Sequence, residues 1–427
     1  MFRTTTFRRT LASAAVLGVA SLGLAACGGD DAEGGEDSNT ITFGVLQQQT
    51  GTNPFKTLAE KYQEESGVTV EVKEFPGESF SQSLRPQLQS GSAPDVFYTT
   101  GGSGDPGSTI PFAEAGELAP IDSEAAASNV PENQRDAFFL DDELYGMPLD
   151  LDTAGPVFNQ GAADEAGLSY PTTYDEMLGV CEDLAGDGKS WIALAGAAPP
   201  NTGLLGLALA AQNVYADEPD WNAQREAGDV TFADSEGWQR TMEQILEMQE
   251  TGCFQKGAEG AQFDAITGGL GQATSYVAFT PGGAAADLMG GIPDSTFTIQ
   301  PFPGETAEDT VLVASANDAL SINANAKNPQ GAQDFVDWMA QPEQAALFAE
   351  GSGGVPASGT EGVTLPAQYD DVVSFLEEDR FVPIPNQTWA GGAVYDAMGS
   401  GIQGLLTGQA SAEDVLAGMD EAWDSAE

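Results

Sequence analysis

The stretch that decides the fold class is ITFGVLQQQTGTNPFKTLAEKYQEESGVTVEVKEF, residues 41–75. Residues 41–46 predict a short buried strand, and residues 54–67 place apolar side chains at helical spacing before a glycine that ends the helix. Residues 68–75 alternate between apolar and polar side chains, which predicts a second strand. The order strand, helix, strand predicts a β-α-β unit.

The same alternation continues after this unit. A helix is expected over about 79–89 and a strand within APDVFYTT, residues 93–100. This order predicts a mainly parallel sheet covered by helices on both faces. Ligands of such sheets bind at the carboxyl ends of the strands, which here are residues 47–53 and 98–102. Both segments are rich in amides, hydroxyls and glycines, so they suit binding better than a reaction.

Residues 1–39 have the composition of an export signal followed by a tether. Arginines precede an uncharged apolar stretch, residues 11–26, which is shorter than the roughly 20 residues of a membrane-spanning helix. Leu24-Ala25-Ala26-Cys27 resembles the lipobox of bacterial lipoproteins, in which the cysteine is lipidated. We therefore expect a lipoprotein signal peptide over 1–26 and an acidic flexible tether over 27–39, with Cys27 anchored at the extracellular face of the cell membrane. An ordinary secretory signal with an incidental cysteine is the alternative, and the export route, general or twin-arginine, stays open.

The charge balance excludes one class of partner. The chain has 66 acidic and 14 basic residues, a formal net charge of −52. Nothing in it could neutralise the phosphates of a nucleic acid, so nucleic acid is excluded as a partner. The acids are scattered over the expected helices, which predicts a solvated surface and suits a salt-rich environment.

The content of histidine and cysteine limits the chemistry further. The chain has no histidine, which removes the usual general base and every Ser-His-Asp or Cys-His arrangement. Apart from Cys27, the only cysteines are Cys181 and Cys253. Thiols on the exported side of a membrane tend to pair, so we predict a disulfide between them, with two buried free thiols as the alternative.

Three short matches to cofactor motifs lack a required feature. Residues 186–190 end like a phosphate-binding loop, but Asp183 stands where that loop needs a glycine. Residues 399–404 fit G-x-G-x-x-G, but they follow a helical stretch instead of a strand. Residues 150–152 begin like a calcium loop, but Gly161 stands at its closing carboxylate position. We expect no cofactor and no metal site.

Segments spread over nearly the whole mature chain resemble the extracellular solute-binding proteins of ABC importers. The resemblance is to family 1, which binds carbohydrates and includes proteins like maltose-binding protein. The segments that carry this resemblance, in the order of the family, are residues 91–100, 144–160, 170–186, 269–283, 319–358 and 405–423. They include YGMPLDLD, residues 145–152, and the helix pair with its Gly-Pro turn in residues 319–358.

The resemblance implies an α/β, two-lobe, type II periplasmic-binding-protein-like fold with discontinuous lobes around a ligand cleft. The chain would cross between the lobes at Tyr145–Asp150, near Ala319–Ala324 and shortly after Phe375. The N-terminal lobe would then comprise 40–149 and 319–376, and the C-terminal lobe 150–318 and 377–427. The predicted disulfide would lie within the C-terminal lobe.

The resemblance also suggests ligand-binding residues. Trp389 occupies the place of a stacking tryptophan in the family, with a core tryptophan as the alternative. Asp152 stands where the family has a ligand-contacting acid, with a solvated loop acid as the alternative. The other candidates follow strands or stand in the expected ligand-facing loop: Tyr98, Thr99, Thr100, Gln47, Gln49, Thr280, Pro281, Gly282 and Gly283.

The sequence leaves three function classes open. The first class, which the resemblance implies, is a monomeric lipoprotein that is no enzyme. It would bind a small molecule, most readily a sugar or oligosaccharide, and deliver it to the transmembrane subunits of an ABC permease. The second class is a binding protein for another solute, and the many acids favour a cationic one such as a polyamine. The third is an exported hydrolase that uses paired carboxylates, which needs no histidine.

Overall fold

The β-α-β unit expected at residues 41–75 is present in the computed structural model. Strands β1 (Thr40–Leu46) and β2 (Thr69–Phe75) pair in parallel over their whole length, and helix α1 (Pro54–Ser66) connects them. The Asn53 side chain accepts a hydrogen bond from the backbone N–H of Phe55 at 3.1 Å, and Gly67 ends the helix with φ of +74°. Both ends of α1 therefore follow from the local sequence.

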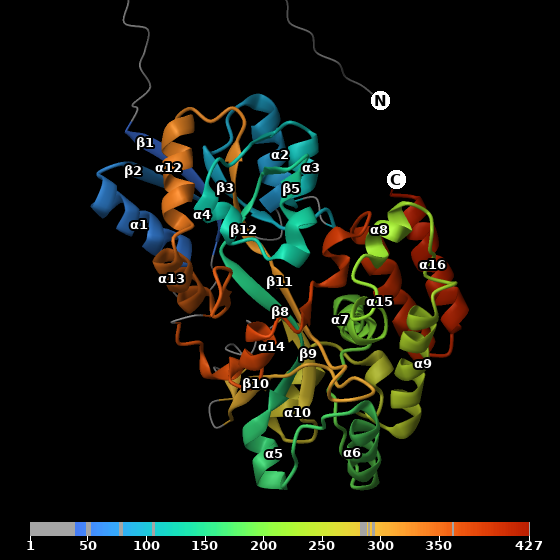
Figure 1. Cartoon of the computed structure of the whole chain (residues 1–427). Coiled ribbons are helices and arrows are strands. Elements are labelled where there is room, and N and C mark those ends of the chain that lie inside the picture. The colour runs from blue at the N-terminus through green and yellow to red at the C-terminus, as the bar shows by residue number, and fades with distance from the viewer. Residues whose placement is uncertain are drawn as a thin grey trace, which may run out of the picture. The chain divides into compact units, whose positions relative to one another are not determined.

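The structure describes residues 39–47, 53–76, 80–104, 107–281, 288, 291–292, 295–360 and 363–426. All of these belong to one unit, Ser38–Glu427. Within it, two sheets each carry their own helices, and we refer to them as the first and second lobes (Figure 1).

The sheet of the first lobe has the strand order β2-β1-β3-β12-β4, and β7 also pairs with β12. Strands β2, β1 and β3 are parallel as predicted, but β12 is antiparallel to β3, β4 and β7. The expectation of a mainly parallel sheet is thus correct only for its N-terminal half, because β12 enters this sheet from the second lobe. The remaining N-terminal elements of this lobe are α2 (Phe80–Ser90), β3 (Val96–Thr100), α3 (Thr109–Glu114), β4 (Leu118–Ala119), α4 (Glu124–Ser128), η2 (Glu132–Ala137), β5 (Phe139–Leu140), β6 (Glu143–Leu144) and β7 (Met147–Pro148).

The sheet of the second lobe has the order β10-β8-β11-β14, and both β9 and β13 also pair with β8. Strand β8 (Asp150–Asn159) is its centre, antiparallel to β9, β10, β11 and β13. The elements that follow β8 as far as β11 are α5 (Gln160–Ala166), α6 (Tyr174–Gly186), α7 (Pro199–Ala210), η3 (Ala211–Tyr215), α8 (Trp221–Glu226), α9 (Glu236–Thr251), η4 (Ala258–Gly260), α10 (Asp264–Gly271), β9 (Val277–Pro281), β10 (Phe297–Ile299) and β11 (Leu312–Ala316).

The C-terminal part of the chain serves both lobes. Strand β12 and helices α12 and α13 pack against the first sheet and α1, whereas β14, α15 and α16 belong to the second lobe. These last elements are β12 (Asp318–Asn323), α12 (Pro329–Met339), α13 (Pro342–Ser352), β13 (Val355–Pro356), η5 (Ala367–Tyr369), α14 (Val373–Glu377), β14 (Phe381–Val382), η6 (Pro385–Thr388), α15 (Gly392–Leu406) and α16 (Ala412–Asp424).

Two strand connections link the sheets next to each other. The chain leaves the first sheet after β7 and enters the second at β8, and it returns between β11 and β12. The backbone N–H of Leu149 donates to the carbonyl of Asp318 at 2.8 Å, so the two connections lie side by side. The lobe boundaries at 149/150, 318/319 and 376/377 stay a prediction.

Helices α7, α9, α15 and α16 pack together in the second lobe (Figure 1). Five of the six tryptophans are buried in the core of the second lobe, each with at most 1% of its surface exposed: Trp191, Trp221, Trp238, Trp389 and Trp423. Burial of an aromatic side chain stabilises a fold by several kcal/mol, so this cluster is a main source of stability for the lobe.

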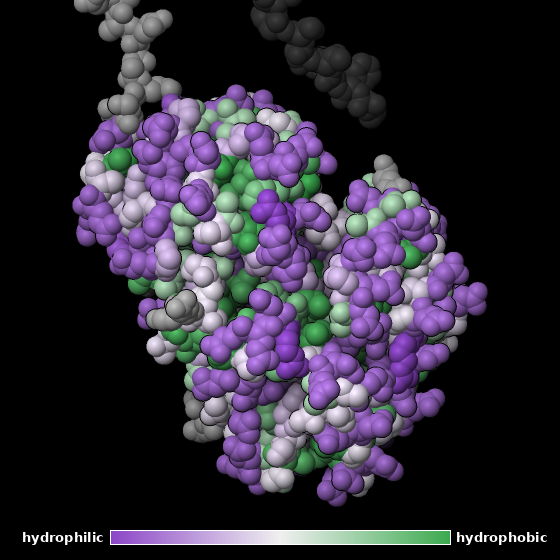
Figure 2. Space-filling view, in the orientation of Figure 1, coloured by the Kyte–Doolittle hydropathy of each residue, from purple (hydrophilic) through white to green (hydrophobic). Residues whose placement is uncertain are grey.

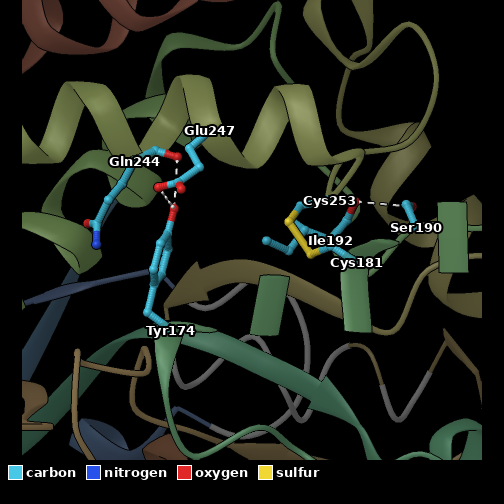
Figure 3. Close-up of a disulfide and its surroundings, with 7 residues drawn as sticks. All are labelled: Tyr174, Cys181, Ser190, Ile192, Gln244, Glu247 and Cys253. Carbon is cyan, nitrogen blue, oxygen red and sulfur yellow. Dashed lines mark hydrogen bonds between the residues drawn. A yellow bond between two sulfur atoms is a disulfide. The ribbon is translucent and has the colours of Figure 1, made fainter. Parts of the chain in front are cut away.

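The predicted disulfide between Cys181 and Cys253 is formed (Figure 3). It joins α6 to the residue that follows the C-cap of α9. At the first residue of α6, the Tyr174 hydroxyl lies 3.2 Å from a carboxylate oxygen of Glu247 and 3.3 Å from the carbonyl of Gln244, both on α9 (Figure 3). Helices α6 and α9 are therefore joined at two places.

The surface agrees with the acidic composition. Hydrophilic residues cover most of the face shown in Figure 2, and hydrophobic residues are visible mainly between them in its middle. Within the described ranges, no helix has the length and apolar character needed to cross a bilayer.

Candidate functional site

Three carboxylates meet where the chain passes between the lobes. Asp150 is the first residue of β8 and Asp318 the first of β12, and Asp152 lies two residues further along β8. The backbone N–H of Asn317 donates to the carbonyl of Asp150 at 3.4 Å, which brings the two strand starts together. We call Asp150, Asp152 and Asp318 the junction acids.

Two of these carboxylates accept hydrogen bonds from hydroxyl groups of other elements. Tyr98, on β3, donates from its hydroxyl to Oδ1 of Asp318 at 2.9 Å. Ser352, the last residue of α13, donates to Oδ2 of Asp150 at 3.0 Å. A glycine is needed two residues after this helix ends, because a Cβ at Gly354 would lie 2.8 Å from Oδ2 of Asp150.

The surroundings of the junction acids disfavour their charged forms. Burial, followed by the charge of Asp318, raises the pKa of Asp152 to about 7. The same two causes and the charge of Asp152 raise the pKa of Asp150 well above its usual value. Burial also raises the pKa of Asp318, although the hydrogen bond from Tyr98 opposes this. The site therefore holds protons at pH values where a solvated aspartate has none.

Buried polar side-chain atoms without a close hydrogen-bond partner occur at several positions of the second lobe. Among the described side chains six such atoms occur, and four belong to Asp150, Thr153, Thr280 and Asn386. Thr280 is on β9 opposite Gly155 of β8, near Thr153 along the strand. Asn386 is two residues after Ile384, whose backbone N–H donates to the hydroxyl of Ser315. Ser315 in turn pairs with Asp152 in the β8–β11 register. Side chains alternate between the two faces of a strand, so Thr153 and Thr280, which pairs with Gly155, lie on the opposite face of the second sheet from Asp150 and Asp152.

A glycine loop after β3 joins the first lobe to η6 of the second. The backbone N–H groups of Ser103 and Gly104 donate to the carbonyl of Gln387 at 2.9 and 3.0 Å. Gly102 has φ of +85°, and a side chain at this position would overlap that carbonyl. The glycines predicted at this strand end thus permit a close contact between the lobes.

The structure brings together two of the predicted site residues directly. Asp152 is one of the junction acids, and Tyr98 reaches them through Asp318. Thr280 pairs with Gly155 of β8, so its side chain lies on the sheet face opposite to that of Asp152. Their contact with a ligand stays a prediction.

Three other candidates lie differently. Thr99 is fully buried, and its hydroxyl is hydrogen-bonded to Ser321 at 2.8 Å. The Thr100 hydroxyl is 3.2 Å from that of Ser108. Gln47 is exposed at the end of β1. Gln49, Gly282, Gly283 and Cys27 lie outside the described residues, as does the side chain of Pro281.

Trp389 requires a correction. Its indole is fully buried, and its Nε1–H donates to the hydroxyl of Tyr215 at 3.2 Å. The ring packs against Phe232 and Trp238, with centroid distances of 5.7 and 6.0 Å. A ring enclosed in this way has no free face for a ligand, so the structure shows the core tryptophan that the sequence left as the alternative.

Several residues at this place were not among the sequence candidates. They are Asp150, Asp318, Ser352 and Tyr369. A signal was present, because Asp318 directly precedes the expected hinge strand 319–324 and Asp150 ends the first expected crossing. Within the described residues, no group of three or more His, Cys, Asp and Glu side chains is arranged to hold a metal ion.

Comparison with known proteins gives the family. The family model described as bacterial extracellular solute-binding protein matches residues 48–346. The multiple sugar-binding protein of Streptococcus mutans is 24% identical over 336 residues, 76% of this chain and 76% of that protein. The melibiose/raffinose/stachyose-binding protein MelE of Bacillus subtilis is 21% identical over 414 residues, 93% of this chain and 91% of that protein.

A solved structure confirms the fold. RafE in complex with raffinose superimposes with a TM-score of 0.70 at 19% identity, covering 91% of this chain and 99% of the RafE chain. The two-lobe α/β fold of type II that the resemblance implied is therefore confirmed. Because the family model matches well over half of its residues, the chain belongs to the bacterial extracellular solute-binding proteins.

Proposed function

We propose that a monomer of this chain captures a sugar or oligosaccharide outside the cell and delivers it to the transmembrane subunits of an ABC importer, without chemistry of its own. The observation that carries the proposal is that the solute-binding family model matches residues 48–346 and that two sugar-binding relatives align over most of the chain. Sugar hydroxyls both donate and accept hydrogen bonds, so they can pair with carboxyl, hydroxyl and amide groups at once. The names of the two relatives and the raffinose in the RafE structure support a sugar over a polyamine.

The ligand class is tested by thermal shift. Melibiose, raffinose, stachyose, xylo-oligosaccharides and spermidine are each added to the purified protein over a range of concentrations. A sugar at 100 times its Kd should stabilise the fold by about 2.7 kcal/mol and raise Tm by several degrees.

A matched pair of variants shows whether the junction is the site. Asp152→Asn should weaken the sugar by about 10-fold, because a strong carboxylate acceptor is lost. Asp229→Asn removes the same charge from an exposed position and should leave the affinity unchanged. A shift with spermidine alone would contradict the sugar proposal, and equal affinities of the two variants would contradict the proposed site.

We also propose that Cys27 carries the lipid anchor and that residues 27–39 act as a tether. The support is the lipobox-like Leu24-Ala25-Ala26-Cys27 and the acidic, glycine-rich stretch after it. Cys27→Ala should move the protein from the membrane fraction to the medium or the soluble exported fraction, measured by immunoblot after fractionation. Ligand affinity should stay the same, because the tether separates the anchor from the fold. Full membrane association of Cys27→Ala would contradict the anchor.

A further inference from the structure

A cavity of about 550 Å³ lies in the second lobe, where helices α6 and α9 end. Its lining comes from within the segments 185–190 and 249–259, together with Thr274 and Leu406. None of these lining residues belongs to β8 or β12, which carry the junction acids. The cavity is therefore separate from the place between the lobes, and the proposed function does not use it.

Two of the lining residues are lysines, Lys189 and Lys256. The chain has only 14 basic residues against 66 acidic ones, so two at one cavity are unusual. Among the described residues neither lysine forms an ion pair with a carboxylate, and this includes Glu259, the one acid of the lining. The basic residues that do form such pairs lie elsewhere: Lys56, Lys61, Arg225, Arg240 and Arg380. The lining thus carries a positive excess in a strongly negative chain.

Lys189 is held in place without losing its capacity to bind. Its Nζ donates to the hydroxyl of Tyr276 at 2.8 Å and lies 5.3 Å from the centroid of that ring. Tyr276 is fully buried, so it fixes the position of the ammonium group. An ammonium group has three donors, and two of them stay available for a ligand. Because the side chain is already ordered, a ligand loses less free energy on ordering it.

The walls of the cavity are also fixed. The side-chain Nε2–H of Gln249 donates to the carbonyl of Leu406 at 2.8 Å. Gln255 accepts from the backbone N–H of Leu194 at 2.9 Å and donates to its carbonyl at 2.6 Å. The disulfide joins α6 to Cys253, which stands between two lining residues, and Ser190 of the lining lies beside it (Figure 3). The cavity is therefore formed before any ligand arrives.

We propose that this cavity is a second binding site, for a small solute that carries two or more negative charges, such as a polycarboxylate or a phosphate ester. Two ammonium groups can each form a charge-assisted hydrogen bond with an anionic oxygen. At 0.15 M salt charges are screened over about 8 Å, so the nearby lysines outweigh the acids elsewhere on the chain. A neutral sugar gains little from these lysines, and a polyamine is repelled by them.

The test is calorimetry of the purified protein with citrate, inorganic phosphate and acetate at constant ionic strength. We expect citrate or phosphate to bind at one site with a Kd of about 1 mM or below. Acetate, with one charge, should bind at least about 10-fold more weakly. The tighter of the first two probes then identifies the ligand as a polycarboxylate or a phosphate. Failure of both to bind at about 10 mM would overturn the proposal.

Three variants show whether the binding takes place in the cavity. Lys256 is exposed, so Lys256→Gln should keep the fold and weaken the tighter probe by about 5- to 10-fold. Lys73→Gln removes the same charge from an exposed position on β2 and should leave the affinity unchanged. Thr274→Trp fills the cavity without a change of charge and should abolish binding.

Wild-type affinity in both Lys256→Gln and Thr274→Trp would show that the anion binds elsewhere, and it would overturn the proposal. A saturating sugar should leave the affinity for the anion unchanged, because the two sites share no residue. The proposal does not depend on the proposed function. If no sugar binds in the thermal-shift screen but citrate or phosphate binds here, only the proposed function is wrong.

Discussion

Trp389→Ala should lower the free energy of unfolding by about 3–5 kcal/mol, the range found when a buried aromatic side chain is truncated in a core. The indole is fully buried between Phe232 and Trp238, so its removal leaves a cavity and takes away two ring contacts. The hydroxyl of Tyr215 also loses the donor at 3.2 Å. Urea unfolding followed by circular dichroism measures this loss.

The half-buried Trp338 on α12 provides a matched control. Its Nε1–H donates to Glu65 at 3.0 Å on the protein surface. Trp338→Ala should therefore cost only about 1–2 kcal/mol, because much of the ring already contacts water. Trp389→Phe, which keeps an aromatic ring, should recover a large part of the stability. A Trp389→Ala protein with the stability of the wild type and no sugar binding would instead restore the role of a stacking platform.

The local pattern of the sequence was sufficient for the first β-α-β unit. Residues 41–75 carry their own strand periodicity, helix periodicity and glycine cap, so β1, α1 and β2 appear within one residue of the expected bounds. The direction of β12 could not be obtained in this way. It depends on the path of the chain through the second lobe, which no local periodicity records.

The candidate site was predicted only in part, for a related reason. Tyr98 stands at a strand end that the pattern identified, and Asp152 was indicated by the family resemblance. Both reach the junction. Asp150 and Asp318 become neighbours only because two connections between the lobes lie side by side. The resemblance indicates a stacking role for Trp389, because this residue occupies the place of a stacking tryptophan in the family. Its burial is decided by Phe232 and Trp238, which are distant in the sequence.

Removing the disulfide should lower the free energy of unfolding by about 4 kcal/mol, by the chain-entropy model for a cross-link of this span. Cys181 and Cys253 are 72 residues apart, so the bond excludes many extended conformations of the unfolded chain. In the double variant Cys181→Ala/Cys253→Ala, Tm should fall by roughly 5 °C, measured by calorimetry. The sugar affinity should not change at a temperature where the variant is folded, because the bond joins α6 to the residue after the C-cap of α9 (Figure 3) and neither cysteine belongs to β8 or β12.

A reductant separates the effect of the cross-link from the effect of the lost side chains. Both sulfurs are buried, so dithiothreitol should act on the wild type only once the protein unfolds, and the reduced protein should then melt near the temperature of the double variant. The double variant itself should be insensitive to the reductant.

Helices α6 and α9 also meet through Tyr174 and Glu247 at 3.2 Å, so Tyr174→Phe tests the second connection between them. This substitution should cost only about 1 kcal/mol, since it removes one hydrogen bond and keeps the ring. A double variant that melts with the wild type would show that these remaining contacts, and not the cross-link, hold the two helices together.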